Sequence, residues 1–186
     1  ENAVENRLLA SDFLDLIDGY KPDLIGFSSL ESTWDRTVEL LDSLEKCNAT
    51  VLVGGIFPTF AQEIVLGHSA VDLICVGEGE GALVDLCEKL GNGENYDSVA
   101  NLWVKQADGT IKKNPPRPAL DISELNIPDY SVFDHARFLR PMAGTIYRTA
   151  PVETVRGCPY KCAFCNSPTM YDLYAKSGTG SFLRKK

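Results

Sequence analysis

Residues 71–91, "VDLICVGEGEGALVDLCEKLG", predict a strand, a glycine-rich turn and a helix in one continuous stretch. The run "VDLICV" is short and mostly apolar, as is typical of a strand buried on both faces of a sheet. "GALVDLCEKLG" then carries apolar residues at helical spacing and ends at Gly91. A buried strand that leads directly into a helix indicates an α/β fold.

The same order of strand and helix occurs twice upstream of this stretch. Residues 22–30, "PDLIGFSSL", and 49–55, "ATVLVGG", are short apolar runs that predict strands, and a helix is predicted after each, at 32–47 and 58–69. A further helix is predicted at 5–18. Strands of this kind, alternating with helices, predict an α/β domain with a flavodoxin- or Rossmann-like parallel sheet.

The pattern changes after residue 93. Residues 101–114, "NLWVKQADGTIKKN", are two alternating runs around Asp108-Gly109, which predicts a β-hairpin. The proline-rich residues 115–134 predict an extended linker. We therefore expect three parts: an α/β domain at 1–93, a hairpin and linker at 94–150, and a third part at 151–186.

Composition excludes several classes of protein. The chain has 186 residues, with 18 Lys and Arg against 26 Asp and Glu, so its formal net charge is −8. This acidic balance argues against a nucleic-acid-binding surface. No apolar run approaches the ~20 residues that span a bilayer, so no membrane association is expected. The opening "ENAVENRLLA" is not a secretory signal, lacks an initial Met and resembles the interior of a helix, which predicts a fragment cut at both ends.

The ends of the three predicted strands carry small residues, in "SSL", "GG" and "GEGE". Ligands of open α/β sheets bind beyond the carboxyl ends of the strands. Gly54 and Gly55 permit close approach of the backbone to a ligand, although they also fit a structure in which they only turn the chain. The residues alone leave both interpretations open. "GEGEG" is not a phosphate loop, because it lacks a Lys and carries two carboxylates.

Three of the six cysteines lie within eight positions, as Cys158-x3-Cys162-x2-Cys165. Structural zinc requires four ligands, and a disulfide would leave one thiol over. Iron–sulfur clusters are held by thiolates on short loops of this kind, so we favour a cluster over zinc, and zinc over a purely structural loop. Crowded cysteines in an otherwise ordinary chain also favour a reducing compartment, and the cytoplasm is expected.

"CPYKCAFC", residues 158–165, matches the radical S-adenosylmethionine signature, and the chain resembles that family throughout "VETVRGCPYKCAFCNSP". The resemblance implies a 4Fe-4S cluster on the three cysteines that binds S-adenosylmethionine, with Phe164 against the adenine. It also implies radical C–H chemistry on a small molecule, giving methylation, cyclisation or rearrangement, with an electron donor such as flavodoxin or ferredoxin. "PVETV" would be the first strand of a partial (β/α) barrel, with the cysteine loop at its carboxyl end.

The upstream part is similar to the cobalamin-binding domain often fused before that barrel. In "PDLIGFSSL", Ser28 and Leu30 take the positions that would line the pocket for the displaced nucleotide base. In "VLVGG", Gly54 and Gly55 would flank the nucleotide tail. Fused proteins of this type are often labelled magnesium-protoporphyrin IX monomethyl ester cyclase-like.

Two motifs of the fused family are missing. The cobalamin-binding D-x-H-x2-G loop would follow a strand upstream of Glu1, and the barrel stops after one strand. We therefore expect a fragment of a radical S-adenosylmethionine enzyme that does not turn over substrate alone, with cobalamin binding left open. Without a preceding strand, Leu24 to Phe27 would form an exposed edge and favour self-association. The alternatives are a non-catalytic cobalamin- or ligand-binding module and a zinc-stabilised interaction protein.

Overall fold

The computed structural model describes residues 2–44 and 47–185, with side chains from residue 9 onward. The chain divides into two compact units, Glu1–Arg117 and Pro118–Lys186. The first unit has the following helices and strands, where η denotes a short 3-10 helix: α1 Asn2–Tyr20, β1 Leu24–Ser28, η1 Glu31–Thr33, α2 Trp34–Asp42, β2 Thr50–Gly54, α3 Ile56–Phe60, α4 Gln62–Leu66, β3 Leu73–Cys75, α5 Glu80–Gly91, β4 Leu102–Lys105 and β5 Ile111–Lys113. Those of the second are η2 Tyr130–Val132, η3 His135–Phe138, β6 Leu139–Met142, β7 Thr145–Arg148, β8 Val155–Arg156, α6 Ser167–Ser177 and β9 Arg184–Lys185.

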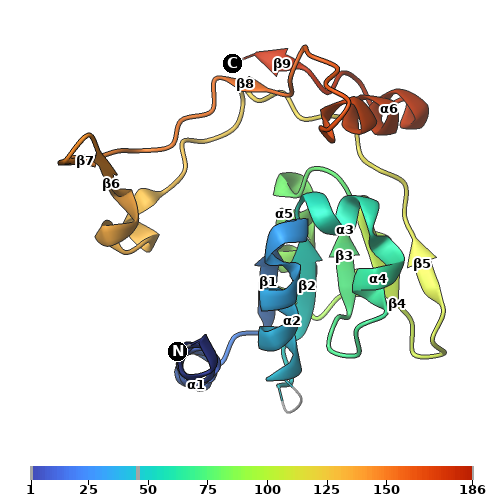
Figure 1. Ribbon diagram of the computed structural model, residues 1–186. Coiled ribbons are helices and arrows are strands. Elements are labelled where there is room, and N and C mark those ends of the chain that lie inside the picture. The colour runs from blue at the N-terminus through green and yellow to red at the C-terminus, as the bar shows by residue number, and fades with distance from the viewer. Residues whose placement is uncertain (1, 45–46, 186) are drawn as a thin grey trace. The chain divides into compact units, whose positions relative to one another are not determined.

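The first unit is built on one five-stranded sheet in the order β1-β2-β3-β4-β5 (Figure 1). β1, β2 and β3 are parallel, which confirms the predicted α/β fold. The hairpin predicted at Asp108-Gly109 is also confirmed, as β4 and β5. Its first strand pairs antiparallel with β3, with Trp103 opposite Ile74, so the hairpin belongs to the same sheet as the parallel strands.

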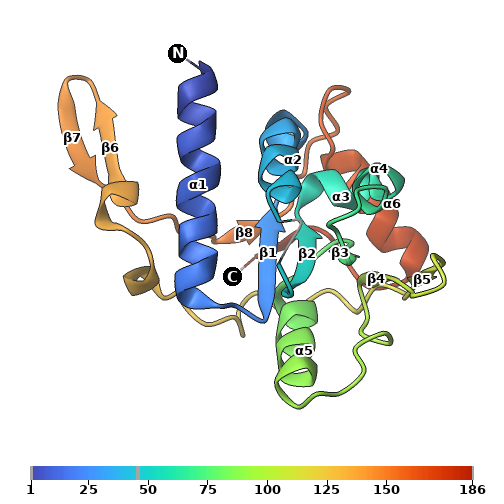
Figure 2. The ribbon, with the colours of Figure 1, turned by 90° about the horizontal axis from the view of Figure 1, so that it is seen from below.

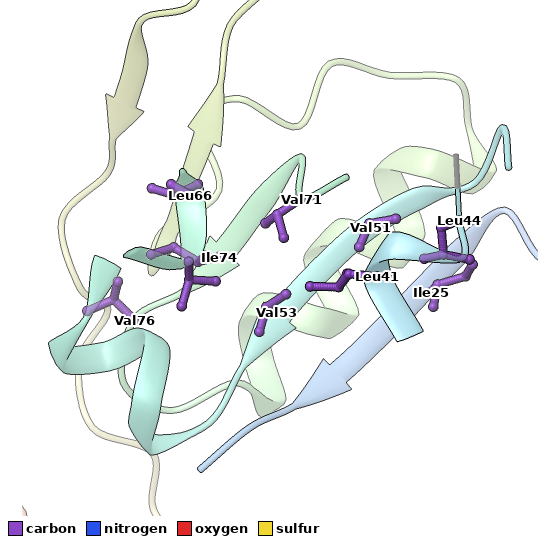
Figure 3. Close-up of a cluster of buried hydrophobic side chains, with 10 residues drawn as sticks. Ile25, Leu41, Leu44, Val51, Val53, Leu66, Val71, Ile74 and Val76 are labelled. Atoms are coloured by element: carbon purple, nitrogen blue, oxygen red, sulfur yellow. The ribbon is translucent and has the colours of Figure 1, made fainter. Parts of the chain in front are cut away.

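Helices cover both faces of this sheet, with α2, α3 and α4 on one side and α5 on the other (Figures 1 and 2). Successive residues of a strand point to opposite faces. Val51 and Val53 accordingly join the cluster under α2 and α4, whereas Leu52 joins the cluster under α5. Figure 3 shows the first cluster, whose buried members are Ile25, Leu41, Leu44, Val51, Val53, Val65, Leu66, Val71, Ile74 and Val76. The two-sided core explains why these strands are nearly continuous apolar runs.

The single helix predicted at 58–69 is instead two short helices, α3 and α4. Ala61 separates them because its backbone is not helical, with φ −120° and ψ 44°. The Thr59 hydroxyl donates to the backbone oxygen of Gly55, 2.8 Å away, and so fixes the first of these helices on the end of β2.

β1 is an edge of the sheet, and among the described strands it pairs with β2 alone. Its side chains are less exposed than predicted. Ile25 is buried, and Leu24 and Phe27 are half-buried. The ring of Phe13 on α1 packs edge-on against Phe27, with ring centroids 5.9 Å apart, so α1 covers part of the surface expected to be open.

In its described residues, the second unit contains two small antiparallel sheets, one α-helix and two short 3-10 helices. β6 pairs with β7, and β8 pairs with β9. The hairpin β6–β7 lies after the segment 115–134 that was predicted to be an extended linker, within the part predicted as hairpin and linker at 94–150, and all eight of its residues are exposed. α6 buries Met170 and Tyr174, and Phe182 packs its ring on Tyr171 and Tyr174. Across both units, none of the described helices has the length and apolar character needed to cross a bilayer.

Candidate functional site

The carboxyl ends of β1 and β2 bring the four predicted cofactor-binding residues of this unit close together. Ser28 lies opposite Gly54 in the parallel register. The backbone N–H of Ser29 donates to the oxygen of Gly54, 2.9 Å away. Leu30 follows with its side chain 52% exposed. The four residues therefore lie at one edge of the sheet.

Gly55 lies where the backbone at the end of β2 closely approaches the backbone after β1. Its φ is +101°, a conformation that residues with a side chain rarely adopt. A Cβ at this position would lie 2.7 Å from the backbone oxygen of Ser29 and 3.2 Å from Oγ of Ser28. The absence of a side chain at Gly55 therefore allows the ends of β1 and β2 to meet at this distance.

Three buried polar side chains that the sequence analysis did not single out support the same edge. The hydroxyls of Ser29 and Thr37 are 3.2 Å apart, and Ser29 is fully buried. Thr59 accepts a hydrogen bond from the backbone N–H of Gly77, 3.1 Å away, and so links the end of β2 to the loop after β3. No spacing or motif marks these residues, because their roles depend on segments that are distant in the sequence.

The loop after β3 is the third segment that borders this site, beside the carboxyl ends of β1 and β2. Asn101 holds it through a hydrogen bond from its Nδ2 to the backbone oxygen of Val76, 2.6 Å away. Cys75, at the end of β3, points into the cluster under α5, and its thiol donates to the oxygen of Glu78 at 3.7 Å. Burial, followed by the negative charge of Glu80, raises the pKa of Cys75 to about 12. Cys75 is therefore a protonated packing residue at neutral pH.

A hollow of about 990 Å³ lies at the opposite, amino-terminal ends of β1 and β2. Its walls include Ile17 of α1, Asp23 before β1 and Thr50 of β2. Because parallel strands begin there and end at Ser28 and Gly54, a ligand in this hollow would not touch the predicted residues. We therefore regard the carboxyl edge, rather than this hollow, as the candidate site.

The cysteine loop lies in the second unit, between β8 and α6. Cys158 is half-buried, Cys162 and Cys165 are exposed, and all three are free thiols. Sγ of Cys165 lies 3.5 Å from both the backbone N and the Oγ of Ser167. Hydrogen bonds from the Ser167 side chain and backbone lower the pKa of Cys165, which favours the thiolate that binds metals.

The three sulfur atoms are not gathered into a metal site. Among the residues that the structure describes, no three His, Cys, Asp or Glu side chains are arranged to hold one metal ion. The donor set nevertheless suits an iron–sulfur cluster, since it offers accessible thiols on one short loop. Phe164 has its side chain 93% exposed, so it too is accessible to a ligand. β8 contains only Val155–Arg156, so it overlaps the predicted first barrel strand, residues 151–155, at Val155 alone, and it pairs antiparallel with β9.

Comparison with known proteins relates the first unit to cobalamin-binding domains. The B12 binding domain family matches residues 2–87. An uncharacterized methyltransferase of Pyrococcus horikoshii is 29% identical over 168 residues, which cover 88% of this chain and 36% of that protein. A hopanoid C-3 methylase of Methylococcus capsulatus is 29% identical over 168 residues, which cover 87% of this chain and 31% of the methylase. The chain thus spans about a third of the length of these curated relatives.

The fold is also that of a cobalamin-dependent S-adenosylmethionine radical enzyme, OxsB. Its structure with aqua-cobalamin and S-adenosylmethionine bound matches with a TM-score of 0.67 and 22% identity, over 91% of this chain and 25% of OxsB. The predicted cyclase label has weaker support, because an anaerobic magnesium-protoporphyrin IX monomethyl ester cyclase of Synechocystis is only 24% identical over 122 residues, 63% of this chain and 23% of the cyclase. Residues 2–87 thus match a B12 binding domain, in a chain whose relatives include methyltransferases and whose fold is similar to that of about a quarter of the OxsB chain.

Proposed function

We propose that this chain is part of a cobalamin-dependent radical S-adenosylmethionine enzyme that methylates a small molecule. The observation that carries the proposal is the loop of three free thiols, Cys158, Cys162 and Cys165, in a chain that also contains a match to the B12 binding domain. The choice of methylation over cyclisation or rearrangement rests on the names of the methyltransferase relatives.

The carboxyl edge of the first unit would hold cobalamin through small residues and backbone. Gly54 and Gly55 would lie along the nucleotide tail, and Ser28 and Leu30 would border the base. The exposed Leu30 supplies an apolar surface, and the exposed Ser28 supplies a hydroxyl. Bound cobalamin would supply a methyl carrier. The residues fit this group, because the glycines leave the edge without side chains where a ligand would approach the backbone.

The cysteine loop would hold a 4Fe-4S cluster through its three sulfur atoms, with Phe164 against the adenine of S-adenosylmethionine. When bound, the cluster would supply the electron that cleaves S-adenosylmethionine, from a donor such as flavodoxin or ferredoxin. Cys165 would bind as a thiolate, the form that Ser167 favours. Because the three thiols are not gathered as a metal site, cluster binding requires the loop to draw them together.

We also propose that the chain self-associates through β1. The supporting observation is that β1 is an edge strand, which among the described strands pairs with β2 alone. Unpaired backbone at an edge is a template for pairing with another strand. Light scattering on the purified chain is expected to give the mass of a dimer, and a monomer at all concentrations would contradict this part of the proposal.

Anaerobic reconstitution with iron and sulfide tests the cluster. The chain is expected to become brown and to bind about four iron atoms, whereas a variant with Cys158→Ala, Cys162→Ala and Cys165→Ala is expected to bind none. A matched control replaces the three other cysteines, Cys47, Cys75 and Cys87, which the structure places in the first unit. Iron in both variants, or a colourless wild-type chain that binds one zinc, would contradict the proposal and favour a zinc-stabilised protein.

A further inference from the structure

We propose that Thr59 and Asn101 lock the peptide bond between Val76 and Gly77 in one orientation, and that this lock positions the loop after β3 to bind cobalamin. The first part rests on hydrogen bonds of the chain itself. The second part rests on the proposed function, and the experiment below separates the two.

Both polar groups of this one peptide bond are held by buried side chains. The N–H of Gly77 donates to Oγ1 of Thr59, 3.1 Å away. The carbonyl oxygen of Val76 accepts from Nδ2 of Asn101, 2.6 Å away. The N–H and C=O of a trans peptide point in opposite directions, so Thr59 and Asn101 hold its two ends. Rotation of the peptide plane would break both hydrogen bonds.

The two side chains are themselves fixed, so they cannot follow a rotating peptide. Thr59 is 2% exposed and donates to the oxygen of Gly55, 2.8 Å away. Asn101 is 3% exposed, and its Oδ1 accepts from the backbone N–H of Arg117, 2.9 Å away. The backbone oxygen of Asn101 also accepts from the N–H of Val76, at 2.9 Å. Each side chain therefore connects the peptide to a different part of the unit.

Side-chain hydrogen bonds matter for the orientation of this peptide because it precedes a glycine. Gly77 has a φ of +85°, and glycine populates positive and negative φ about equally. Without side-chain partners, the Val76–Gly77 peptide would have a second orientation of similar energy. The φ of Gly77 and the directions of the N–H and C=O of this peptide, at the start of the loop that borders the candidate site, would then differ between the two orientations.

The hydrogen bonds also join the loop to the rest of the site. From the oxygen of Gly55 they pass through Thr59 to the Val76–Gly77 peptide, and from there through Asn101 to Arg117. Nη2 of Arg117 pairs with Oδ2 of Asp85 on α5, 2.7 Å away. Thr59 and Asn101 are thus positioning residues, which act on a ligand through the peptide that they hold.

The lock predicts a characteristic pattern of affinity. Apparent affinity falls with the fraction of protein in the binding-competent orientation. If each hydrogen bond shifts the peptide equilibrium by about tenfold and the unbonded orientations are equal in energy, the wild-type peptide is roughly 99% locked, and losing one bond weakens binding only about 1.1-fold. Losing both weakens binding about twofold, which is more than the product of the single effects. Two residues that act independently of each other would weaken binding by the product of their single effects.

The first measurement is hydrogen exchange at the Gly77 amide, followed by NMR on the full 186-residue chain. Thr59→Val removes the acceptor of this amide, and Thr59→Ser retains it. Asn101→Gly suits the positive φ of 71° at this position and removes only the side chain. We expect Asn101→Gly to accelerate Gly77 exchange about tenfold, although Asn101 does not contact that N–H. Thr59→Ser is expected to exchange like wild type.

Asn114→Gly is the matched control. Nδ2 of Asn114 donates to the oxygens of Asp97 and Leu102, at 2.8 and 2.7 Å, so this variant also loses two hydrogen bonds of a side-chain amide. Neither bond involves the Val76–Gly77 peptide, and no change at Gly77 is expected. The lock is overturned if Asn101→Gly leaves Gly77 exchange unchanged or if Asn114→Gly accelerates it equally.

The second measurement is equilibrium dialysis of hydroxocobalamin against wild type, Thr59→Val, Asn101→Gly and the double variant. A loss in the double variant larger than the product of the single losses supports positioning of the site. Losses that multiply, or no losses, overturn positioning. If the wild-type chain does not bind hydroxocobalamin, the cobalamin part of the proposed function and the positioning role both fail, whereas Gly77 exchange still decides the lock.

Discussion

Gly55→Ala is expected to lower the free energy of unfolding of the first unit by about 3 kcal/mol. The new Cβ would lie 2.7 Å from the oxygen of Ser29, a backbone atom that cannot swing away. The φ of +101° adds strain, because residues with a side chain avoid it. Relief requires β1 and β2 to separate at their carboxyl ends, where the backbone of Ser29 bonds to Gly54 and to Phe57.

Gly54→Ala is the matched control, one residue earlier on the same strand. A Cβ at Gly54 would lie 3.8 Å from Cβ of Cys75, an ordinary van der Waals contact. We expect a change of less than about 1 kcal/mol, of either sign. Urea unfolding followed by circular dichroism measures both variants. Equal losses in the two variants would show that the ends of β1 and β2 are not packed as closely as the structure indicates.

The stability of the first unit is expected to fall as pH rises above 9, because of Cys75. The folded chain keeps this thiol protonated up to its pKa of about 12, whereas in the unfolded chain the thiol titrates near its ordinary value of 9.0. Between these values the unfolded chain binds fewer protons, so the free energy of unfolding decreases with pH. The loss from this one group is about 2 kcal/mol by pH 10.5.

Cys75→Ala isolates this contribution. The variant loses some packing in the cluster under α5, but the difference between its stability and that of wild type should shrink by about 2 kcal/mol from pH 8 to pH 10.5. Lys105 has a pKa lowered by burial, which acts in the opposite direction, but it is present in both proteins and cancels in the difference. Parallel pH profiles for the two proteins would show that Cys75 is accessible to water.

Most strands and helices of the first unit can be predicted from the sequence, and physical reasons explain which features of the chain cannot. Strands buried on both faces leave continuous apolar runs, and Asp108-Gly109 has the chemistry of a tight turn, so both were predictable. The hairpin β6–β7 was missed because Ala143-Gly144 forms its turn, and Ala143 adopts a φ of +48° that its residue type does not indicate. Likewise, alternation along 58–69 does not reveal the break at Ala61.

Part of the candidate site can likewise be predicted from the sequence, and part cannot. Residue types and spacing predict Cys158, Cys162 and Cys165 as metal ligands, because a short-range motif carries that information, whereas they leave the role of the glycines at the end of β2 open. They do not identify Thr59 or Asn101, whose hydrogen bonds connect residues 18 and 25 positions apart. Nor does spacing fix how far apart three sulfur atoms lie on a loop, since that distance depends on the backbone between them.

The strand order β1-β2-β3-β4-β5 has a consequence for how the first unit folds. Among the described strands of this sheet, each pairs with the strand next to it along the chain. Forming each strand pair therefore costs only the entropy of closing the one segment that connects the two strands. Topologies with such local pairing fold faster than those that bring distant strands together. During synthesis, each strand of this sheet can add to the one before it as the chain emerges, well before the cysteine loop has been made.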